Sequence, residues 1–437
     1  GYRQFLYDHV REILQLMPVD GFFFDIVGPR PSLARHWLDA MDNAGLNPED
    51  ERDRYRFAVK VIQDWEREMT EFVRQFNRDC TIFYNSGHVG PRHRASCEAY
   101  THYELESLAS GGWGYMHFPQ TVRYARRLGK ECLGMTGKFH TTWGDFGSFK
   151  NPAALQFECF RMLALGAKCA VGDQLHPSGR IDRHTYALIG SVYAEVEKKE
   201  PWCREVEPVV EIGVLTPEEF AKADERNQPA AVGAVRVFQE LRCQFDVIDS
   251  QCDFSPYKVL VLPDAIPVDE GLAQKLESFL RGGGAVIASY RSGLRPDGTG
   301  FATAALGVQL KGEAPYSPDF IVPGDALAAG VRATGNVMYR RGLEVEALPG
   351  SEVLAQVEVP YFNRTWRHFC SHGHTPSSGK VGYPGVVRRG NAIYFMHPVF
   401  SQYQENAPHW CKQLVANALS LVLPQRVVEV EGPSTLM

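Results

Sequence analysis

The sequence predicts an α/β protein that begins with part of a (β/α)8 barrel, strands four to eight, and continues into a flavodoxin-like α/β domain and a β-rich C-terminal region. Three observations predict this. Apolar runs of strand length alternate with amphipathic helical segments over the first 205 residues. Polar side chains follow the end of each run. The 437 residues exceed one domain of about 150 residues. We therefore expect three regions, at residues 1–205, 206–300 and 301–437.

The first region contains five strand patterns and five helix patterns. The predicted strands cover residues 21–27, 80–85, 100–106, 132–138 and 168–172. The predicted helices cover residues 2–17, 53–78, 117–129, 151–166 and 183–199. Buried strands that alternate with helices form a parallel sheet, which is either open or closed into a barrel. A barrel gathers its site from many strand ends, whereas an open sheet uses one switch point, so the polar residues after every strand favour the barrel.

A complete barrel needs eight strands and about 250 residues, and only five strand patterns are present. The first pattern is a helix, so the missing strands are one to three and residues 22–25 end strand four. We expect the chain to be an N-terminally truncated copy that alone is inactive or insoluble.

The remaining sequence changes character after residue 205. Strands are predicted at 209–215, 258–263 and 285–289, and helices at 229–242 and 270–281. Beyond about residue 305 period-two stretches dominate, such as 352–359 and 392–396, before a last helix at 408–422. No cysteine occupies a strand–helix elbow of the flavodoxin-like region, which argues against an amidotransferase and favours a scaffold role.

Composition excludes several classes of protein. Hydrophobic residues make up 44% and charged residues 22% of the chain, as in a soluble globular protein, and the net charge of −6 argues against nucleic acid as a partner. No apolar run approaches the roughly 20 residues of a membrane span. The 10 cysteines include no C-x-x-C pair, so we expect reduced thiols and a cytoplasmic protein. A secretion signal upstream of Gly1 is compatible with this sequence.

The candidate catalytic residues are carboxylates that follow predicted strands. Asp25 ends an aromatic run at the expected barrel mouth, where it can serve as a nucleophile or general base, or merely cap a turn. Glu104 and Glu106 lie on the same face of one strand, because side chains alternate. Two like charges there resist simultaneous ionisation, so one is suited to act as a general acid. The alternative is that one of them anchors Arg92 or Arg94, and the spacing leaves open which is catalytic.

Two carboxylates from different strands are what the hydrolysis of a glycosidic bond requires, and aromatic and polar side chains bind sugars. Candidate substrate-binding residues share a position near a strand end: Asn85, His102, Trp113, Tyr115, His140, Trp143, Asp145, Asp173 and His176. A loop at 363–374 contributes Arg364 and His372, either as a solvated loop or as a segment that reaches over a sugar pocket of its own or a neighbouring subunit.

Other chemistries have less support. The sequence contains no G-x-S-x-G elbow and no glycine-rich phosphate loop. His102, Glu104 and Glu106 have no standard zinc spacing. We expect neither a metal nor a cofactor.

Several longer motifs resemble a known group of proteins. They are Asp-Gly-Phe-Phe-Phe-Asp, His-Tyr-Glu-Leu-Glu-Ser, Gly-Gly-Trp-Gly-Tyr, Thr-Gly-Lys-Phe-His-Thr-Thr-Trp-Gly-Asp and Gly-Asp-Gln-Leu-His-Pro-Ser-Gly. This pattern resembles the hypothetical glycosyl hydrolase 6 group, which overlaps the alpha-L-fucosidases of glycoside hydrolase family 151 and is distantly similar to family 29. The α/β domain that follows resembles the trimerisation domain of family 42 beta-galactosidases.

The resemblance implies a retaining exo-glycosidase, an alpha-L-fucosidase, acting on carbohydrate as a homo-oligomer, with a trimer suggested by the second domain. It implies that Asp25 is the nucleophile. The acid/base of family 29 varies in position, so the choice of Glu104 or Glu106 rests on their place in this sequence and is not carried over from the family. Family 42 enzymes use a Glu after strand four and another at strand seven, whereas here strand four ends in Asp25 and residues 132–145 contain no Glu. A beta-galactosidase-like exo-glycosidase and a non-catalytic carbohydrate-binding or assembly protein remain the alternatives.

Overall fold

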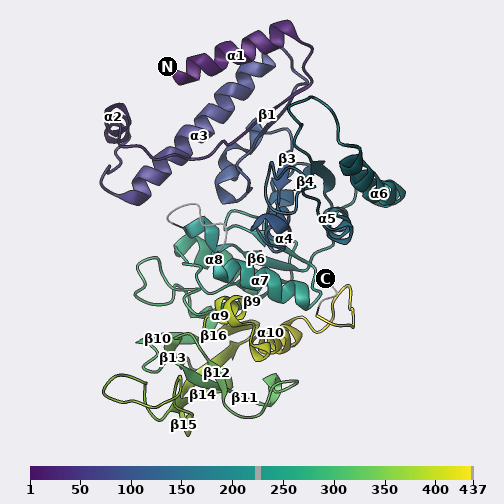
Figure 1. The fold of residues 1–437 in the computed structure, drawn as a ribbon. Helices are drawn as coiled ribbons and strands as arrows, with labels where there is room; N and C mark the ends of the chain where they lie inside the picture. The colour runs from purple at the N-terminus through teal and green to yellow at the C-terminus, as the bar shows by residue number, and fades with distance from the viewer. Residues whose placement is uncertain (222–227, 435–437) are drawn as a thin grey trace. The chain divides into compact units, whose positions relative to one another are not determined.

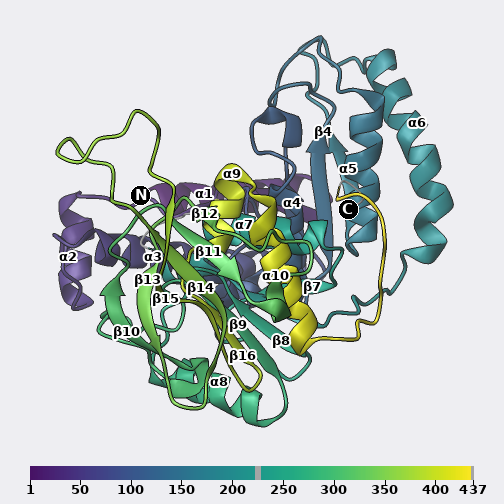
Figure 2. The ribbon, with the colours of Figure 1, turned by 90° about the horizontal axis from the view of Figure 1, so that it is seen from below.

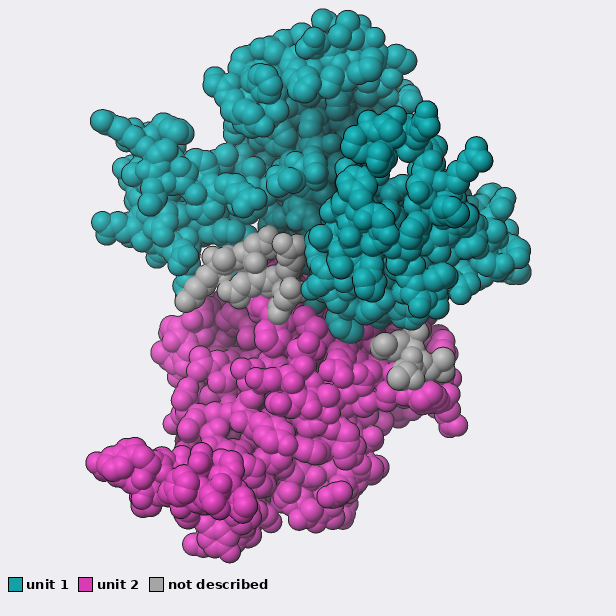
Figure 3. Space-filling model, viewed as in Figure 1, with its two compact units in different colours: residues 1–208, 221–226 teal, residues 209–220, 227–437 magenta. Residues whose placement is uncertain are grey.

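The computed structural model describes residues 1–221 and 228–434 as a mixed α/β protein of two compact units (Figure 3). Unit 1 contains Gly1–Pro208 and Ala221, and unit 2 contains Val209–Phe220 and residues 228–434. The boundary after Pro208 falls close to the change of character that the sequence shows near residue 205. Each unit has its own core, so we describe each by itself.

Unit 1 contains five parallel strands in chain order. They are β1 (Gly21–Phe24), β2 (Thr81–Tyr84), β3 (Tyr103–Glu106), β4 (Cys132–Gly137) and β5 (Lys168–Gly172). The β1–β2 pair and the β3–β4–β5 trio are joined by parallel ladders. Between β2 and β3 the ladder is replaced by Thr101, whose N–H donates to the Ile82 carbonyl at 3.0 Å and whose Oγ1 accepts from the Ile82 N–H at 2.8 Å. The five strands are those that the sequence predicts, each starting or ending within a few residues of the prediction.

Of the α-helices described in unit 1, α3, α5 and α6 begin where the sequence supplies a capping side chain. They are α1 (Tyr2–Leu16), α2 (Arg35–Asn43), α3 (Glu51–Arg74), α4 (His117–Ala125), α5 (Pro152–Ala164) and α6 (Arg183–Lys199), labelled in Figure 1. Asp50, Asn151 and Asp182 each accept hydrogen bonds from the free backbone N–H groups at the start of a helix. The short helix α2 was not predicted from the sequence.

The aromatic run of β1 positions the carboxylate that follows it. Phe22 and Phe24 stack with their ring centroids 5.5 Å apart, and Phe24 meets Trp65 of α3 edge-on at 5.8 Å. Phe23 lies on the other face, against Phe83 of β2 at 5.4 Å. Because strand side chains alternate, Asp25 follows on the face of Phe23, away from helix α3.

Unit 2 is built on one nine-stranded sheet in the order β12-β11-β14-β15-β16-β9-β8-β6-β7. Its parallel part contains β6 (Ile212–Leu215), β7 (Phe245–Ile248), β8 (Val259–Leu262), β9 (Ala285–Ser289) and β16 (Ala392–Phe395). Its antiparallel part contains β11 (Asp319–Pro323), β12 (Asn336–Met338), β14 (Glu352–Pro360) and β15 (Ser377–Arg389). A separate antiparallel pair joins β10 (Val308–Glu313) to β13 (Leu343–Ala347).

The helices of unit 2 cover the parallel strands. They are α7 (Pro229–Glu240), α8 (Glu270–Arg281), α9 (Val399–Asn406) and α10 (His409–Val422). The connections β6–α7–β7 and β8–α8–β9 run in opposite directions along the sheet. Right-handed crossovers therefore place α7 and α8 on opposite faces, as Figure 2 shows.

The predicted boundary near residue 300 does not divide unit 2 into two compact bodies. Strand β16, from the β-rich region, pairs in parallel with β9 of the flavodoxin-like region, with Ile393 opposite Ile287. One buried cluster contains residues from both sides of the boundary, including Leu260 and Tyr394. The two regions share one core for this reason, and their inheritance as separate domains stays a prediction.

Candidate active site

Asp25, Asn85 and Glu106 meet at the carboxyl ends of β1, β2 and β3. The Asn85 amide nitrogen donates one hydrogen bond to Asp25 Oδ1 and one to Glu106 Oε2, each at 2.9 Å. Neighbouring parallel strands end at the same edge, so three residues far apart in the sequence reach one place. Asn85 and Glu106 are buried, whereas Asp25 is exposed.

These three residues line one cavity of about 410 Å³, together with side chains from the loops that follow the strands. Trp143, from the loop after β4, donates its indole N–H to Glu106 Oε1. Trp113 also lines the cavity, as do Arg30 and Arg92. The cavity is therefore surrounded by two carboxylates, two indoles and two guanidinium groups. Its volume is large enough for a sugar, and the indoles offer aromatic surface for the apolar face of a ring.

The backbone after Asp25 is turned back onto its carboxylate. Ile26 has φ 54 and is 76% exposed, a left-handed conformation that is rare for a β-branched residue. In this conformation its N–H donates to Asp25 Oδ1 at 2.9 Å. Strain of this kind is often stored at functional sites. Oδ1 thus accepts two hydrogen bonds, and within the described part of the chain no hydrogen bond reaches Oδ2.

Glu104 does not share the cavity with Glu106. Its carboxylate faces His102, with Oε1 3.0 Å from Nε2, and His102 Nδ1 lies 2.9 Å from Thr101 Oγ1. The two glutamates alternate with Leu105 along β3, but Glu104 lies two residues before Glu106, which ends the strand at the cavity. Among the described residues, no three acidic, His or Cys side chains are arranged to hold a metal ion.

Five other predicted site residues lie outside the lining of this cavity. Tyr115 donates to Glu158 Oε1 at 3.1 Å, and Asp173 is 3.9 Å from the buried Lys138 ammonium. Asp145 accepts from the Thr141 hydroxyl at 2.7 Å, and His176 Nδ1 lies 2.8 Å from Ser178 Oγ. The remaining residue, His140, is exposed on the loop after β4. Their predicted contact with substrate stays a prediction.

The loop at 363–374 belongs to unit 2. Arg364 donates to the Cys370 carbonyl at 3.1 Å and its guanidinium lies 4.9 Å from the Phe369 ring centroid, while His372 is exposed. Trp366, beside them, is 84% exposed. The predicted reach of Arg364 and His372 over a sugar pocket stays a prediction.

Sequence reasoning missed the two arginines that line the cavity. Arg30 was not considered, although Gly28-Pro29-Arg30-Pro31 directly follows the β1 end and its two prolines fix the chain there. Arg92 was considered only as an ion-pair partner for a glutamate. The position of Arg30 could have been used to find it, because loops that follow the carboxyl ends of parallel strands commonly carry binding residues.

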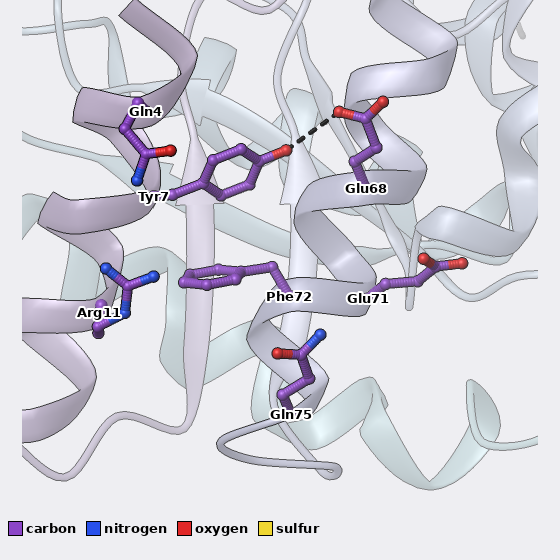
Figure 4. A pocket seen from close by; sticks show the side chains of 7 residues that line it. All are labelled: Gln4, Tyr7, Arg11, Glu68, Glu71, Phe72 and Gln75. Atoms are coloured by element: carbon purple, nitrogen blue, oxygen red, sulfur yellow. Dashed lines mark hydrogen bonds between the residues drawn. The ribbon is translucent and has the colours of Figure 1, made fainter.

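Two other cavities are also lined by two carboxylates each, Glu68 with Glu71 and Asp264 with Glu405, but among the described residues no single amide joins either pair. Between α1 and α3 a groove of about 330 Å³ is lined by residues including Tyr7, Arg11 and Glu71 (Figure 4). There the Tyr7 hydroxyl donates to Glu68 at 3.1 Å, and partial burial raises the pKa of Tyr7. In unit 2 a cavity of about 540 Å³ adjoins Asp264. This carboxylate accepts from the Ser289 and Ser401 hydroxyls and from the Ser401 N–H, and burial raises its pKa.

Known proteins resemble this chain in sequence and in fold. Residues 235–307 match the family model of the beta-galactosidase trimerisation domain. Alpha-L-fucosidase isoenzyme 2 from Paenibacillus thiaminolyticus has a similar structure, with a TM-score of 0.90 and 38% sequence identity. The alignment covers 97% of this chain and 64% of that one, so the chain spans less than two thirds of that protein's length.

Beta-galactosidases are more distant relatives. The cold-adapted beta-galactosidase from Rahnella sp. R3 shares the fold, with a TM-score of 0.72 at 15% identity over 99% of this chain and 74% of that one. Beta-galactosidase Pbg of Clostridium perfringens is 39% identical over 59 residues, 14% of this chain and 9% of that protein.

Within the described residues, no helix combines the length and the apolar character needed to cross a bilayer.

Proposed function

We propose that this chain carries the catalytic carboxylates of a retaining exo-acting glycoside hydrolase, an alpha-L-fucosidase that releases a terminal sugar from glycans. The likeness to the Paenibacillus fucosidase supports this specificity, since it extends over 97% of the chain at 38% identity. The likeness to beta-galactosidases is confined to a short stretch in sequence, and to the fold in structure.

The observation that carries the proposal is the separation of Asp25 and Glu106. Both carboxylates accept a hydrogen bond from Asn85, and the two accepting oxygens each lie 2.9 Å from the same amide nitrogen. The two oxygens are therefore no more than twice this distance, about 5.8 Å, apart. Retaining glycosidases hold their carboxyl groups about 5–5.5 Å apart, whereas inverting enzymes need about 6.5–9.5 Å to admit a water.

The hydrogen bonds support one assignment of the two roles. Asp25 has one oxygen held by two N–H donors and the other open to the cavity, as a nucleophile requires. In the first step Asp25 Oδ2 forms a bond to the anomeric carbon while the bond to the leaving oxygen breaks and Glu106 gives that oxygen its proton. In the second step Glu106 takes a proton from water, whose oxygen replaces Asp25 on the anomeric carbon. Glu104 has no place in either step.

The wider architecture follows from the same proposal. We infer that β1 to β5 are strands four to eight of a (β/α)8 barrel, with the Asp25 cavity at its mouth. Residues 1–205, 206–300 and 301–437 are then the barrel portion, the flavodoxin-like domain and the β-rich region. The match to a trimerisation domain supports a homo-oligomer, with a trimer as the first expectation.

The decisive experiment compares hydrolysis of 4-nitrophenyl alpha-L-fucoside and 4-nitrophenyl beta-D-galactoside by the full gene product and its variants. Asp25→Asn and Glu106→Gln should each lower kcat/KM for the fucoside by about 10³-fold or more, because each removes a reacting group. Glu104→Gln, a matched change two residues away, should stay within about 10-fold of the unchanged protein.

The alternatives predict other results. Preferential hydrolysis of the galactoside would assign the beta-galactosidase activity. Turnover unaffected by Asp25→Asn would exclude the proposed nucleophile, and binding of sugar without any turnover would favour a carbohydrate-binding or assembly protein. A large loss in Glu104→Gln but not in Glu106→Gln would exchange the roles of the two glutamates.

A further inference from the structure

We propose that Asn85 is a positioning residue, which selects the reacting oxygen of each catalytic carboxyl, and not a ligand of the sugar. The inference rests on the proposed function and deepens it. It starts from one side chain that contacts both carboxylates, and it concerns how the reaction is arranged within the cavity.

Both hydrogen-bond donors of the Asn85 side chain are committed to protein groups. A primary amide has two N–H donors and one carbonyl acceptor. Both donors are used, on Asp25 Oδ1 and Glu106 Oε2. The carbonyl oxygen accepts from the Gly87 N–H at 2.9 Å, which fixes which end of the amide faces the carboxylates. A sugar hydroxyl that used an amide N–H would have to displace a catalytic carboxylate.

Two backbone hydrogen bonds also hold Asn85 in place. Its N–H donates to the Phe24 carbonyl at 2.7 Å, and its carbonyl accepts from the Val27 N–H at 2.6 Å. Asn85 is therefore joined to the chain on both sides of Asp25, and it is only 6% exposed. A group this fixed imposes its geometry on the two carboxylates between which it lies.

The amide thereby dictates which oxygen of each carboxyl can react. An N–H group only donates, so Glu106 Oε2 cannot carry a proton toward Asn85 while that bond persists. The Trp143 indole N–H at Oε1 also only donates, so Oε1 can carry the transferred proton once Trp143 gives up this contact; because Asn85 is held on both sides and Trp143 lies on a loop, we place the proton on Oε1. On Asp25, Oδ1 is taken by Asn85 and Ile26, so Oδ2 attacks. The leaving-group oxygen then replaces Trp143 as the partner of Oε1.

The test replaces Asn85 in the full gene product and measures kcat, KM and the pH profile on aryl alpha-L-fucosides with good and poor leaving groups. Asn85→Asp, equal in size but without donors, should lower kcat about 100-fold or more while KM and the affinity for free L-fucose change less than about 3-fold. The loss should be larger for the poor leaving group, which needs the proton more. A third carboxylate should also move both limbs of the pH profile to higher pH.

The kcat of Asn85→Ser, which keeps one donor, should lie between the values for Asn85→Asp and for the unchanged protein. Asn43→Asp, an exposed change in the same unit, should have no effect.

A ligand role would instead raise KM and weaken L-fucose binding at unchanged kcat, which overturns the inference. So would unchanged kinetics, or failure of both Asn85 variants to fold, which would assign Asn85 to the fold alone. If Asp25→Asn is inactive while Asn85→Asp is fully active, only this inference fails. If Asp25→Asn is fully active, the proposed function fails as well.

Discussion

Among the described residues, Ile26 is the β-branched residue whose backbone adopts the left-handed conformation. It combines a β-branched side chain with φ 54, and the side chain is 76% exposed, so little packing offsets the cost. The conformation directs the Ile26 N–H to Asp25 Oδ1. We interpret the strain as the consequence of turning the chain sharply after β1, so that one oxygen of Asp25 is held and the other faces the cavity.

Replacement of Ile26 by Asn, which tolerates the left-handed region, should therefore stabilise unit 1 by about 1 kcal/mol. The backbone donor to Asp25 is unchanged, so kcat should stay within about 3-fold. Urea unfolding and fucoside hydrolysis measure the two effects. Leu33→Asn, at another exposed loop position, is the matched control and should give no gain. A loss of stability in Ile26→Asn would show that the strain is not the controlling feature.

At this scale the sequence alone was sufficient for some residues and not for others. Asp25 and Glu106 follow strands, and their place at one rim could be predicted from the parallel order. Alternation also predicted correctly that Glu104 and Glu106 share a face. It did not show which glutamate reaches the rim, because that depends on where β3 ends relative to its neighbour β4, a register that no local pattern records.

At the scale of elements, the loop after β4 is held by a buried ion pair. Lys150 Nζ lies 2.5 Å from Glu158 Oε2 and 2.7 Å from Thr136 Oγ1, and the two charged side chains are 2% and 5% exposed. The pair fixes one end of the loop to α5, and the Lys150 N–H donates to the Lys138 carbonyl at 2.8 Å. Because this loop contains Trp143, the ion pair supports the partner of Glu106 from a distance.

Loss of the Lys150 charge should leave Glu158 buried without its cation. Lys150→Met should therefore destabilise unit 1 by about 3–5 kcal/mol. The loosened loop should also lower kcat. Lys168→Met is the matched control, because its partner Glu131 is 2.7 Å away but the two side chains are 66% and 74% exposed. Its cost should stay below about 1 kcal/mol. Equal losses in the two variants, measured by urea unfolding, would contradict this role.

Elements with a strong local pattern were predicted from the sequence, and elements defined by long-range pairing were not. Periodicity identified all five strands of unit 1 and the helices α8 and α10. It missed β7 and the β10–β13 pair, which are short and find their partners far along the chain. The 16-residue interval between β14 and β15 likewise reads as a loop, although the strands on each side of it pair closely.

At the scale of the whole molecule, unit 1 contains the cavity lined by Asp25 and Glu106, and unit 2 contains the nine-stranded sheet. The carboxylate pair lies within unit 1, and the match to the trimerisation domain lies within unit 2. The sequence predicts a change of character after about residue 205, close to the end of unit 1 at Pro208. The continuation of one sheet from β9 to β16 depends on pairing between segments about 100 residues apart, which no local signal reveals.

The central claim is that Asp25 attacks the sugar and forms a covalent bond to it. It is tested most directly by treating the full gene product with a 2-deoxy-2-fluoro-alpha-L-fucosyl fluoride, which slows the second step, and mapping the labelled peptide by mass spectrometry. The account predicts one fucosyl group per chain, attached to Asp25 and absent from Asp25→Asn. Attachment to another carboxylate, or inactivation without any covalent label, would contradict it.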